Sequence, residues 1–260
     1  MSAPVTTHVD LDGESIRVWT RGAGPKLGFL AGWGGLPRWI PFLDALAEHR
    51  TVIVPSLPGF PGGGLAHKAL DGQLDWIVAA RRIFMAAGLD GADLVGSCVG
   101  GALAAELAAL WPHGVRRLAL IGPLGFWGKG ERAADLFARR ADEYPGLLCA
   151  DPANYTALKA APNDADPADW EIEQARAAEA CARMLWPLGD TRLAKRLPLI
   201  TQRTLLARGA ADEVVSDRYL RRFGGAIAGE TRIETIAGAG HLAELDRPRE
   251  TARIILDFLA

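Results

Sequence analysis

A cysteine at the centre of a glycine-flanked motif could carry nucleophilic chemistry. The apolar run 92–96 leads into Gly96-Ser97-Cys98-Val99-Gly100-Gly101, and a helical pattern begins at once. This pattern is typical of a nucleophile on a sharp strand-to-helix turn, where small flanking residues avoid clashes. The start of a helix also stabilises a thiolate. Cys98 is therefore the candidate nucleophile, and the alternative is a buried structural cysteine. Ser97 is out of register, because the required glycines would fall on Val95 and Val99.

An acid and a histidine follow the cysteine in the chain order that such a turn requires. Asp212 comes after the strand-like run 203–207, and His241 lies in a glycine-rich loop after the run 232–236. A carboxylate can fix the tautomer of a histidine that acts as base. Alone, each would more often be a turn residue or a solvated side chain. We interpret the other histidines as surface residues: His8, His49, His67 and His113.

Backbone donors for an oxyanion are expected in two places. The segment Phe29-Leu30-Ala31-Gly32-Trp33-Gly34-Gly35 follows a strand and could offer an N–H group without side-chain obstruction. The residue after the nucleophile, Val99, would supply the second N–H. The alternative for the first segment is an ordinary glycine turn.

The elements around these residues predict an α/β fold. Two alternating segments around Asp12-Gly13 predict a hairpin. Apolar runs with helices between them indicate a mainly parallel sheet covered by helices on both faces. The expected strands are 5–10, 15–20, 26–31, 51–55, 92–96, 115–121, 203–207 and 232–236. The expected buried helix stripes are Leu70, Leu74, Ile77, Phe84 and Met85; Leu103, Leu107 and Leu110; and Ala252, Ile255 and Leu259.

A long segment without strand patterns interrupts this alternation. It is rich in Ala, Arg and Asp and contains Trp127, Trp170 and Trp186. We interpret 1–122 and 197–260 as the core domain and 123–196 as a helical cap over the carboxyl edge of the sheet, where ligands bind in open α/β folds. The alternative is a surface bundle with no role at the site. The apolar side chains of the cap favour a small-molecule substrate with an apolar acyl group or a ring.

Composition excludes several other classes of protein. The 260 residues carry a net charge of −2, so no basic field calls for nucleic acid or an anionic membrane. No uninterrupted apolar stretch is long enough to span a bilayer, and the first residues do not resemble a secretory signal. Three cysteines match neither a disulfide framework nor a zinc motif. We therefore expect a cytoplasmic protein with no metal and no cofactor, and the sequence leaves its oligomeric state open.

The motifs together resemble the α/β-hydrolase superfamily over nearly the whole chain. The similarity rests on AGWGG, PSLPGFPGGG, VGSCVGG, RTLLARGAADEVV and AGAGHLAELDRP. Cap-bearing members include carboxylesterases, meta-cleavage-product C–C hydrolases and lactonases. The resemblance implies Cys98 as nucleophile, His241 as general base, Asp212 as orienting acid, and the N–H groups of Trp33 and Val99 as the oxyanion hole.

The chain also departs from the family pattern. Serine is usual at the nucleophile position of this strand-to-helix turn, which is called the nucleophile elbow. Cysteine occurs there in a minority such as dienelactone hydrolases and polyhydroxyalkanoate synthases. Ala31-Gly32 stands where His-Gly is common, and Ser56 stands where Asp is common.

Several reactions fit these residues. The first hypothesis is hydrolysis of an activated ester, thioester or lactone through a thioester on Cys98. Alternatives are C–C bond hydrolysis of a vinylogous diketone acid and acyl transfer to a second nucleophile. A fourth possibility is a non-catalytic ligand-binding protein that has kept the fold.

Overall fold

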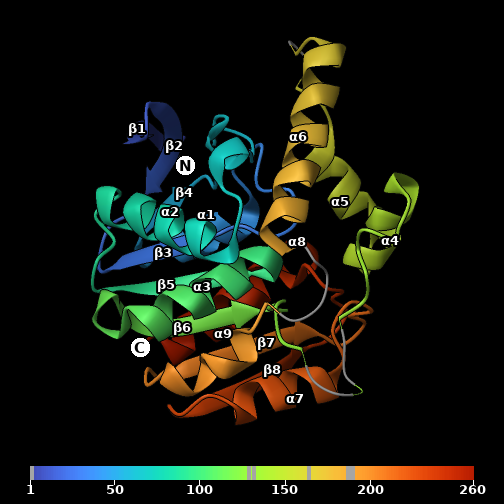
Figure 1. Cartoon of the computed structure of the whole chain (residues 1–260). Coiled ribbons are helices and arrows are strands. Elements are labelled where there is room, and N and C mark those ends of the chain that lie inside the picture. The colour runs from blue at the N-terminus through green and yellow to red at the C-terminus, as the bar shows by residue number, and fades with distance from the viewer. Residues whose placement is uncertain (1–2, 128–129, 131–132, 163–164, 186–190) are drawn as a thin grey trace.

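The computed structural model describes residues 3–127, 130, 133–162, 165–185 and 191–260, and its centre is one eight-stranded sheet (Figure 1). The strand order is β1-β2-β4-β3-β5-β6-β7-β8, with antiparallel pairing only at β1/β2 and β2/β4. The mainly parallel sheet predicted from the sequence is confirmed. The strands are β1 (Val5–Leu11), β2 (Glu14–Arg21), β3 (Lys26–Leu30), β4 (Thr51–Pro55), β5 (Ala92–Ser97), β6 (Val115–Ile121), β7 (Thr204–Gly209) and β8 (Thr231–Ile236).

Helices cover both faces of the sheet, as the sequence predicts. One face packs against α1 and α9 through a core that includes Phe42 and Ile255. The other face packs against α2, α3 and α7 through a core that includes Trp76, Leu103 and Phe223. Continuous apolar runs are stable in β3, β5 and β7 because these central strands are almost wholly buried. The helices are α1 (Pro41–Ala47), α2 (Gln73–Ala86), α3 (Cys98–Leu110), α7 (Asp217–Gly225), α8 (Ala243–Asp246) and α9 (Pro248–Phe258).

The buried stripe of α2 differs from the predicted one. Leu74 and Met85 are 64% and 48% exposed, so their assignment to the core is wrong. The helix begins only at Gln73, so the four-residue spacing from Leu70 to Leu74 is not a helical repeat. Its buried face is set by Trp76, Ile77, Ala79, Ala80, Ile83 and Phe84. Of the other two predicted stripes, only Leu110 is not fully buried.

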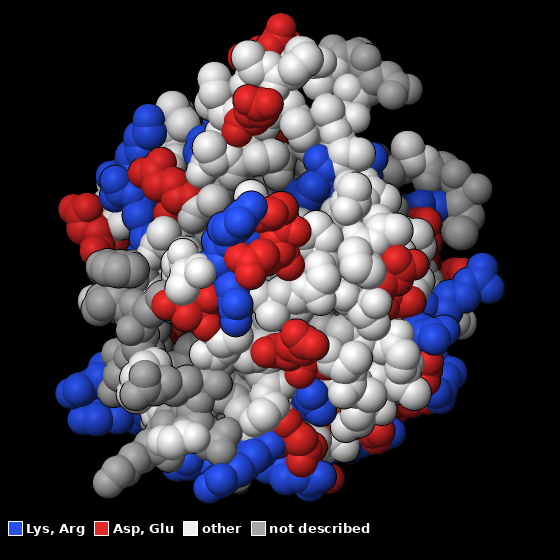
Figure 2. Space-filling model, turned by 90° about the vertical axis from the view of Figure 1, so that its right-hand side faces the viewer, with Lys and Arg blue, Asp and Glu red and all other residues white. Residues whose placement is uncertain are grey.

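A helical segment connects β6 to β7. In the part of it that the structure describes there are three α-helices, α4 (Tyr144–Leu148), α5 (Pro152–Lys159) and α6 (Pro167–Leu185), and no strand. They gather beside one edge of the sheet, and α6 extends away from it (Figure 1). The face that carries these helices mixes acidic and basic side chains with uncharged surface (Figure 2). No helix among the described residues is long and apolar enough to cross a membrane.

The strand order creates a natural ligand crevice. The chain runs from β3 to β4 on one side and later enters β5 on the other side of β3. The connections that follow β3 and β5 therefore leave neighbouring strands in opposite directions, which opens a crevice at the carboxyl ends of the strands. The Trp33 loop follows β3 and Cys98 follows β5, so the fold brings both to this point.

Candidate active site

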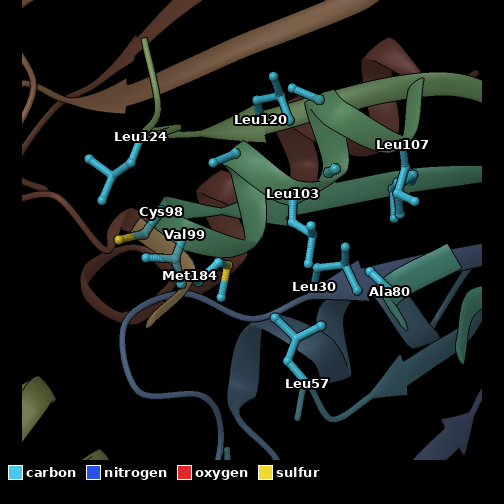
Figure 3. Packing of buried hydrophobic residues seen from close by; sticks show 14 of the residues in the cluster. Leu30, Leu57, Ala80, Cys98, Val99, Leu103, Leu107, Leu120, Leu124 and Met184 are labelled. Carbon is cyan, nitrogen blue, oxygen red and sulfur yellow. The ribbon is translucent and has the colours of Figure 1, made fainter. Parts of the chain in front are cut away.

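Cys98 sits on a strained turn between β5 and α3. Its φ of +51° lies in the left-handed region that non-glycine residues rarely adopt. A methyl group at Gly96 would lie 2.5 Å from the carbonyl oxygen of Gly100, and one at Gly100 would lie 2.4 Å from the carbonyl oxygens of Leu30 and Ala31. Both flanking glycines are therefore required for steric reasons. The side chain of Cys98 projects from the first turn of α3, close to Val99 and Leu124 (Figure 3).

His241 and Asp212 form a buried pair. The Nδ1 of His241 lies 3.1 and 3.0 Å from the two carboxylate oxygens of Asp212. Asp212 also accepts hydrogen bonds from the N–H groups of Val214 and Val215, at 2.8 and 2.9 Å. These bonds hold the carboxylate in place, so the carboxylate can orient the imidazole with Nε2 directed away from it.

His241 and Asp212 shift each other's pKa. Burial alone would lower the pKa of His241, but the Asp212 carboxylate and the Cys98 sulfur outweigh it and raise this pKa well above its ordinary value. Burial opposes ionisation of Asp212, yet His241 and the two valine N–H groups hold the pKa of Asp212 below its ordinary value. The arrangement therefore stabilises the imidazolium that forms when His241 accepts a proton.

Cys98 is the group that faces the other side of the imidazole. Its sulfur is near enough to raise the pKa of His241, although its contact with Nε2 falls short of regular hydrogen-bond geometry in the described structure. Neither Cys98 nor His241 has solvent-exposed surface. A substrate can reach the sulfur only if the residues that cover it move.

The two segments expected to supply oxyanion donors meet at Cys98. A methyl group at Gly32 would be 3.2 Å from the Cβ of Cys98, which places the Trp33 loop against the candidate nucleophile. The Trp33 N–H donates to no other group in the described part of the chain. Val99 is the second residue of α3, and the N–H groups of a first helical turn have no partner within the helix.

Two residues of the helical segment between β6 and β7 form hydrogen bonds with the Trp33 loop. The Nζ of Lys159 donates to the carbonyl oxygens of Gly34 and Gly35, at 3.0 and 3.5 Å. The N–H of Gly34 in turn donates to the Sγ of Cys181, at 3.4 Å. Burial lowers the pKa of Lys159 to about 8. The peptide that follows the Trp33 donor is thus fixed by residues of α5 and α6.

Two acids near the histidine were missed by the sequence reasoning. Glu244 is buried and accepts a hydrogen bond from the Ser97 hydroxyl at 2.5 Å. Asp246 accepts from the N–H groups of Gly240 and Ala150. An acid within the apolar run Leu242-Ala243-Glu244-Leu245 is the only sequence signal that could have marked the first of them.

One expected surface residue is buried. His67 has no exposed surface, so its assignment to the surface is wrong. It packs under Gly59 and α6, and its Nε2 lies 3.6 Å from Glu179. Burial lowers the pKa of His67, and this side chain lies at the contact between the core and the insertion.

An apolar cavity of about 50 Å³ adjoins the site. It is lined by Trp33 of the loop after β3 and by residues 124–127, 133–134, 136–137, 185 and 191. Leu124 connects this cavity to the turn at Cys98, because the Leu124 N–H donates to the carbonyl oxygen of Cys98 at 3.1 Å. Trp127 lines the cavity, whereas the Nε1 of Trp170 donates to the carbonyl oxygen of Lys159 and so connects α6 to α5. Trp186 lies outside the described residues.

A larger hollow of about 610 Å³ lies elsewhere. Its lining includes Pro25 and Arg50, which precede β3 and β4, and Arg253 of α9. It therefore opens at the amino ends of the strands, away from Cys98. No cluster of three or more potential metal ligands occurs among the described residues.

The strand order, the strained turn and the acid–histidine pair define an α/β-hydrolase fold. The chain belongs to the alpha/beta hydrolase family, whose model matches residues 29–254.

Full-length relatives carry hydrolase names. The 2-hydroxy-6-oxo-2,4-heptadienoate hydrolase of Pseudomonas putida is 26% identical over 94% of this chain and 88% of its own length. The 2-hydroxy-6-oxo-6-phenylhexa-2,4-dienoate hydrolase of Comamonas testosteroni is 28% identical over 95% of this chain and 88% of its own length. The solved structure of the 2-hydroxy-6-oxo-6-phenylhexa-2,4-dienoate hydrolase from Rhodococcus sp. strain RHA1 covers 98% of both chains with a TM-score of 0.78 at 18% identity. The last likeness concerns the fold alone.

Proposed function

We propose that this α/β-fold hydrolase cleaves an activated ester, thioester or lactone with Cys98 as nucleophile, His241 as general base and Asp212 as orienting acid. The observation that carries the proposal is the buried Asp212–His241 pair, 3.0 Å apart, beside a cysteine held at a φ of +51°. A structural cysteine needs neither a strained backbone nor a charged partner.

The reaction follows from these positions. The Nε2 of His241 takes the thiol proton as the sulfur of Cys98 bonds to the substrate carbonyl carbon. The carbonyl electron pair moves to oxygen, and the N–H groups of Trp33 and Val99 donate hydrogen bonds to the resulting oxyanion. One such donor typically stabilises the transition state by about 3 kcal/mol. The carbonyl re-forms, the bond to the leaving group breaks, and the imidazolium returns the proton to that group.

A water molecule completes the cycle. His241 removes a proton from water as the water oxygen attacks the thioester carbon. The C–S bond then breaks, the proton returns to sulfur, and a carboxylic acid leaves. A thiolate is a better leaving group than an alkoxide, so activated carbonyl compounds suit this nucleophile. The apolar lining of the cavity beside Trp33 favours an apolar acyl group or a ring.

We also propose that residues 123–196 act as a cap on a core of 1–122 and 197–260. Support comes from the sealed cysteine and from the bonds of Lys159 and Cys181 to Gly34. Opening of this segment would admit substrate, and its closure would exclude water from the thioester until hydrolysis.

The test is trapping of the acyl-enzyme. The protein is incubated with p-nitrophenyl esters and acyl thioesters, and its intact mass and peptide map are measured. An acyl adduct on Cys98, absent from Cys98→Ala but retained in the matched variant Cys149→Ala, is the expected result. Normal turnover by Cys98→Ala would overturn the proposal. Turnover that needs an added thiol or alcohol acceptor would indicate acyl transfer instead, and recovery of unchanged ligand would indicate a binding protein.

The relatives support a second candidate reaction. Both full-length relatives are named for hydrolysis of 2-hydroxy-6-oxo-dienoates, which are C–C cleavage substrates. Incubation with such a dienoate tests this reaction: C–C hydrolysis releases a carboxylic acid and a shorter 2-hydroxydienoate, which chromatography separates. Ester turnover without dienoate cleavage would restrict the enzyme to the first reaction.

A further inference from the structure

The Ser97 hydroxyl occupies the position from which helices are usually capped, yet it does not cap α3. Ser97 is the N-cap residue, with φ −113° and ψ 139°, and its side chain accepts no hydrogen bond from the first turn. In ordinary helices an N-cap serine accepts from the N–H of the second or third helical residue. Here these are Val99, the expected oxyanion donor, and Gly100.

The Ser97 hydroxyl forms a hydrogen bond with Glu244 instead of with the first turn of α3. It donates to the Oε1 of Glu244 at 2.5 Å, and both side chains are buried. The other oxygen of Glu244 has no hydrogen-bond partner in the described structure. Burial of a carboxyl group with a single side-chain donor costs free energy, so its place beside Ser97 points to a role other than packing.

The hydroxyl lies beside the residue that precedes Trp33. A methyl group at Gly32, the residue before Trp33, would lie 3.2 Å from the Oγ of Ser97 and 3.2 Å from the Cβ of Cys98. Because Ser97 is the N-cap residue of α3, a released hydroxyl could turn toward the first turn and accept from the Val99 N–H.

We infer that Glu244 is a positioning residue that holds the Ser97 hydroxyl away from the Val99 N–H and so keeps this donor open to the oxyanion. The inference rests on the proposed function, since it concerns the same oxyanion hole. Glu244 touches neither substrate nor reacting atoms and acts only through Ser97.

The test uses a cycle of variants on a p-nitrophenyl ester. Glu244→Met keeps the side-chain size but removes the acceptor, and kcat should fall by about tenfold to a hundredfold with a smaller change in KM, because removal of one oxyanion donor costs that much or more. Glu244→Gln keeps an acceptor oxygen for Ser97 and should stay within about threefold of the parent. Ser97→Ala alone removes the competing hydroxyl and should also have little effect.

The decisive variant combines Ser97→Ala with Glu244→Met. Without a hydroxyl to cap the helix, kcat should recover to within about fivefold of the parent, because Val99 is open again. A purely structural role for Glu244 predicts no recovery. If Glu244→Met does not fold, Glu244→Asp provides the same comparison, because the shorter side chain retreats from Ser97 and Ser97→Ala should again restore kcat.

A second measurement separates oxyanion binding from general damage. Alkylation of Cys98 by iodoacetamide forms no oxyanion, so its rate in Glu244→Met should stay close to that of the parent while acylation slows. Equal loss of both rates, full activity of Glu244→Met, or failure of Ser97→Ala to restore kcat would overturn the inference. Retained turnover in Cys98→Ala would instead overturn the proposed function, so the two failures are distinguishable.

Discussion

The carboxylate of Asp246 accepts a hydrogen bond of 2.7 Å from the N–H of Gly240, the residue that precedes His241. The same oxygen accepts from the N–H of Ala150, and the other accepts from the side chain of Asn154 at 2.8 Å. A second bond joins the two segments, because the Leu242 N–H donates to the Leu148 carbonyl. The position of the histidine loop is therefore coupled to the position of the insertion.

Asp246→Ala should uncouple these segments. Hydrogen bonds to a charged group are worth roughly 1.5–3 kcal/mol each, so we expect a loss of at least that order in the free energy of unfolding and a fall in kcat/KM. Urea denaturation and ester kinetics measure the two effects. Asp257→Ala is the matched control, since Asp257 is paired only with Arg253 on the exposed face of α9. A variant of Asp246 that behaves like the control would contradict the coupling.

The fold was largely predictable from the sequence, and the reason is physical. The central strands are apolar runs and the first two strands alternate apolar with polar residues, and each predicted range agrees with the observed one to within two residues. The need for glycine is also readable at Gly96, because a Cβ there meets the Gly100 carbonyl of the same motif, whereas a Cβ at Gly100 meets the Leu30 and Ala31 carbonyls of a neighbouring segment. Local steric constraints and hydrophobic periodicity depend on residues that are close in the sequence, so the sequence alone reveals them.

The polar contacts of the site were not predictable in the same way. Ser97 and Glu244 are 147 positions apart, and their bond follows from the meeting of the end of β5 with α8 rather than from any pattern. His67 was misjudged because its glycine-rich surroundings suggest a solvated loop, whereas α6 of the insertion buries it. Pairing across the sheet edge depends on tertiary packing, which spacing alone does not reveal.

Asp212→Asn should nearly abolish turnover while preserving the fold. The asparagine keeps the size of the side chain, but it removes the charge that raises the pKa of His241 and allows the wrong imidazole tautomer. A fall in kcat by about a thousandfold to ten thousandfold is expected for loss of an orienting acid. Steady-state kinetics give the value, and Asp217→Asn, on exposed α7, serves as control. An effect below about tenfold would show that Asp212 does not orient the base.

Lys159→Met should slow catalysis without touching the reacting atoms. The lysine holds the carbonyl oxygens of Gly34 and Gly35, so its loss lets the Trp33 loop drift from the nucleophile. We expect kcat to fall by about tenfold, because small displacements of an oxyanion donor weaken it strongly. Lys195→Met, at an exposed position of the insertion, should leave kcat unchanged. Equal kinetics for the two variants would remove Lys159 from the positioning of this loop.

Gly100→Ala should destabilise the protein far more than Gly101→Ala. The added methyl group at Gly100 would lie 2.4 Å from two backbone carbonyl oxygens, whereas the one at Gly101 would lie 3.1 Å from Pro123. We expect a loss of about 3 kcal/mol or more for the first and about 1 kcal/mol for the second, measured by urea denaturation. Similar losses at both positions would show that the elbow relaxes more freely than its packing indicates.

The buried carboxyl of Glu244 should make stability depend on pH in a defined direction. Burial raises the pKa of Glu244 to about 7 from an ordinary value of 4.5, and the groups that face it are Ser97, His241, Asp246 and Cys149. Between these two pH values the folded state binds the proton and the unfolded state has lost it. This contribution to stability is therefore complete below pH 4.5 and is lost as the pH rises to about 7.

Comparison with Glu244→Gln isolates this contribution. The glutamine does not titrate, so the parent should lose about 3 kcal/mol of unfolding free energy relative to the variant between pH 4.5 and pH 7, from a pKa difference of about 2.5 units. Urea denaturation at intervals of pH measures the difference, and Glu230→Gln, whose side chain is exposed, should show no such trend. If the difference between parent and Glu244→Gln were constant or grew with pH, Glu244 would be ionised throughout, and its bond with Ser97 would be that of a carboxylate at every pH where the enzyme works.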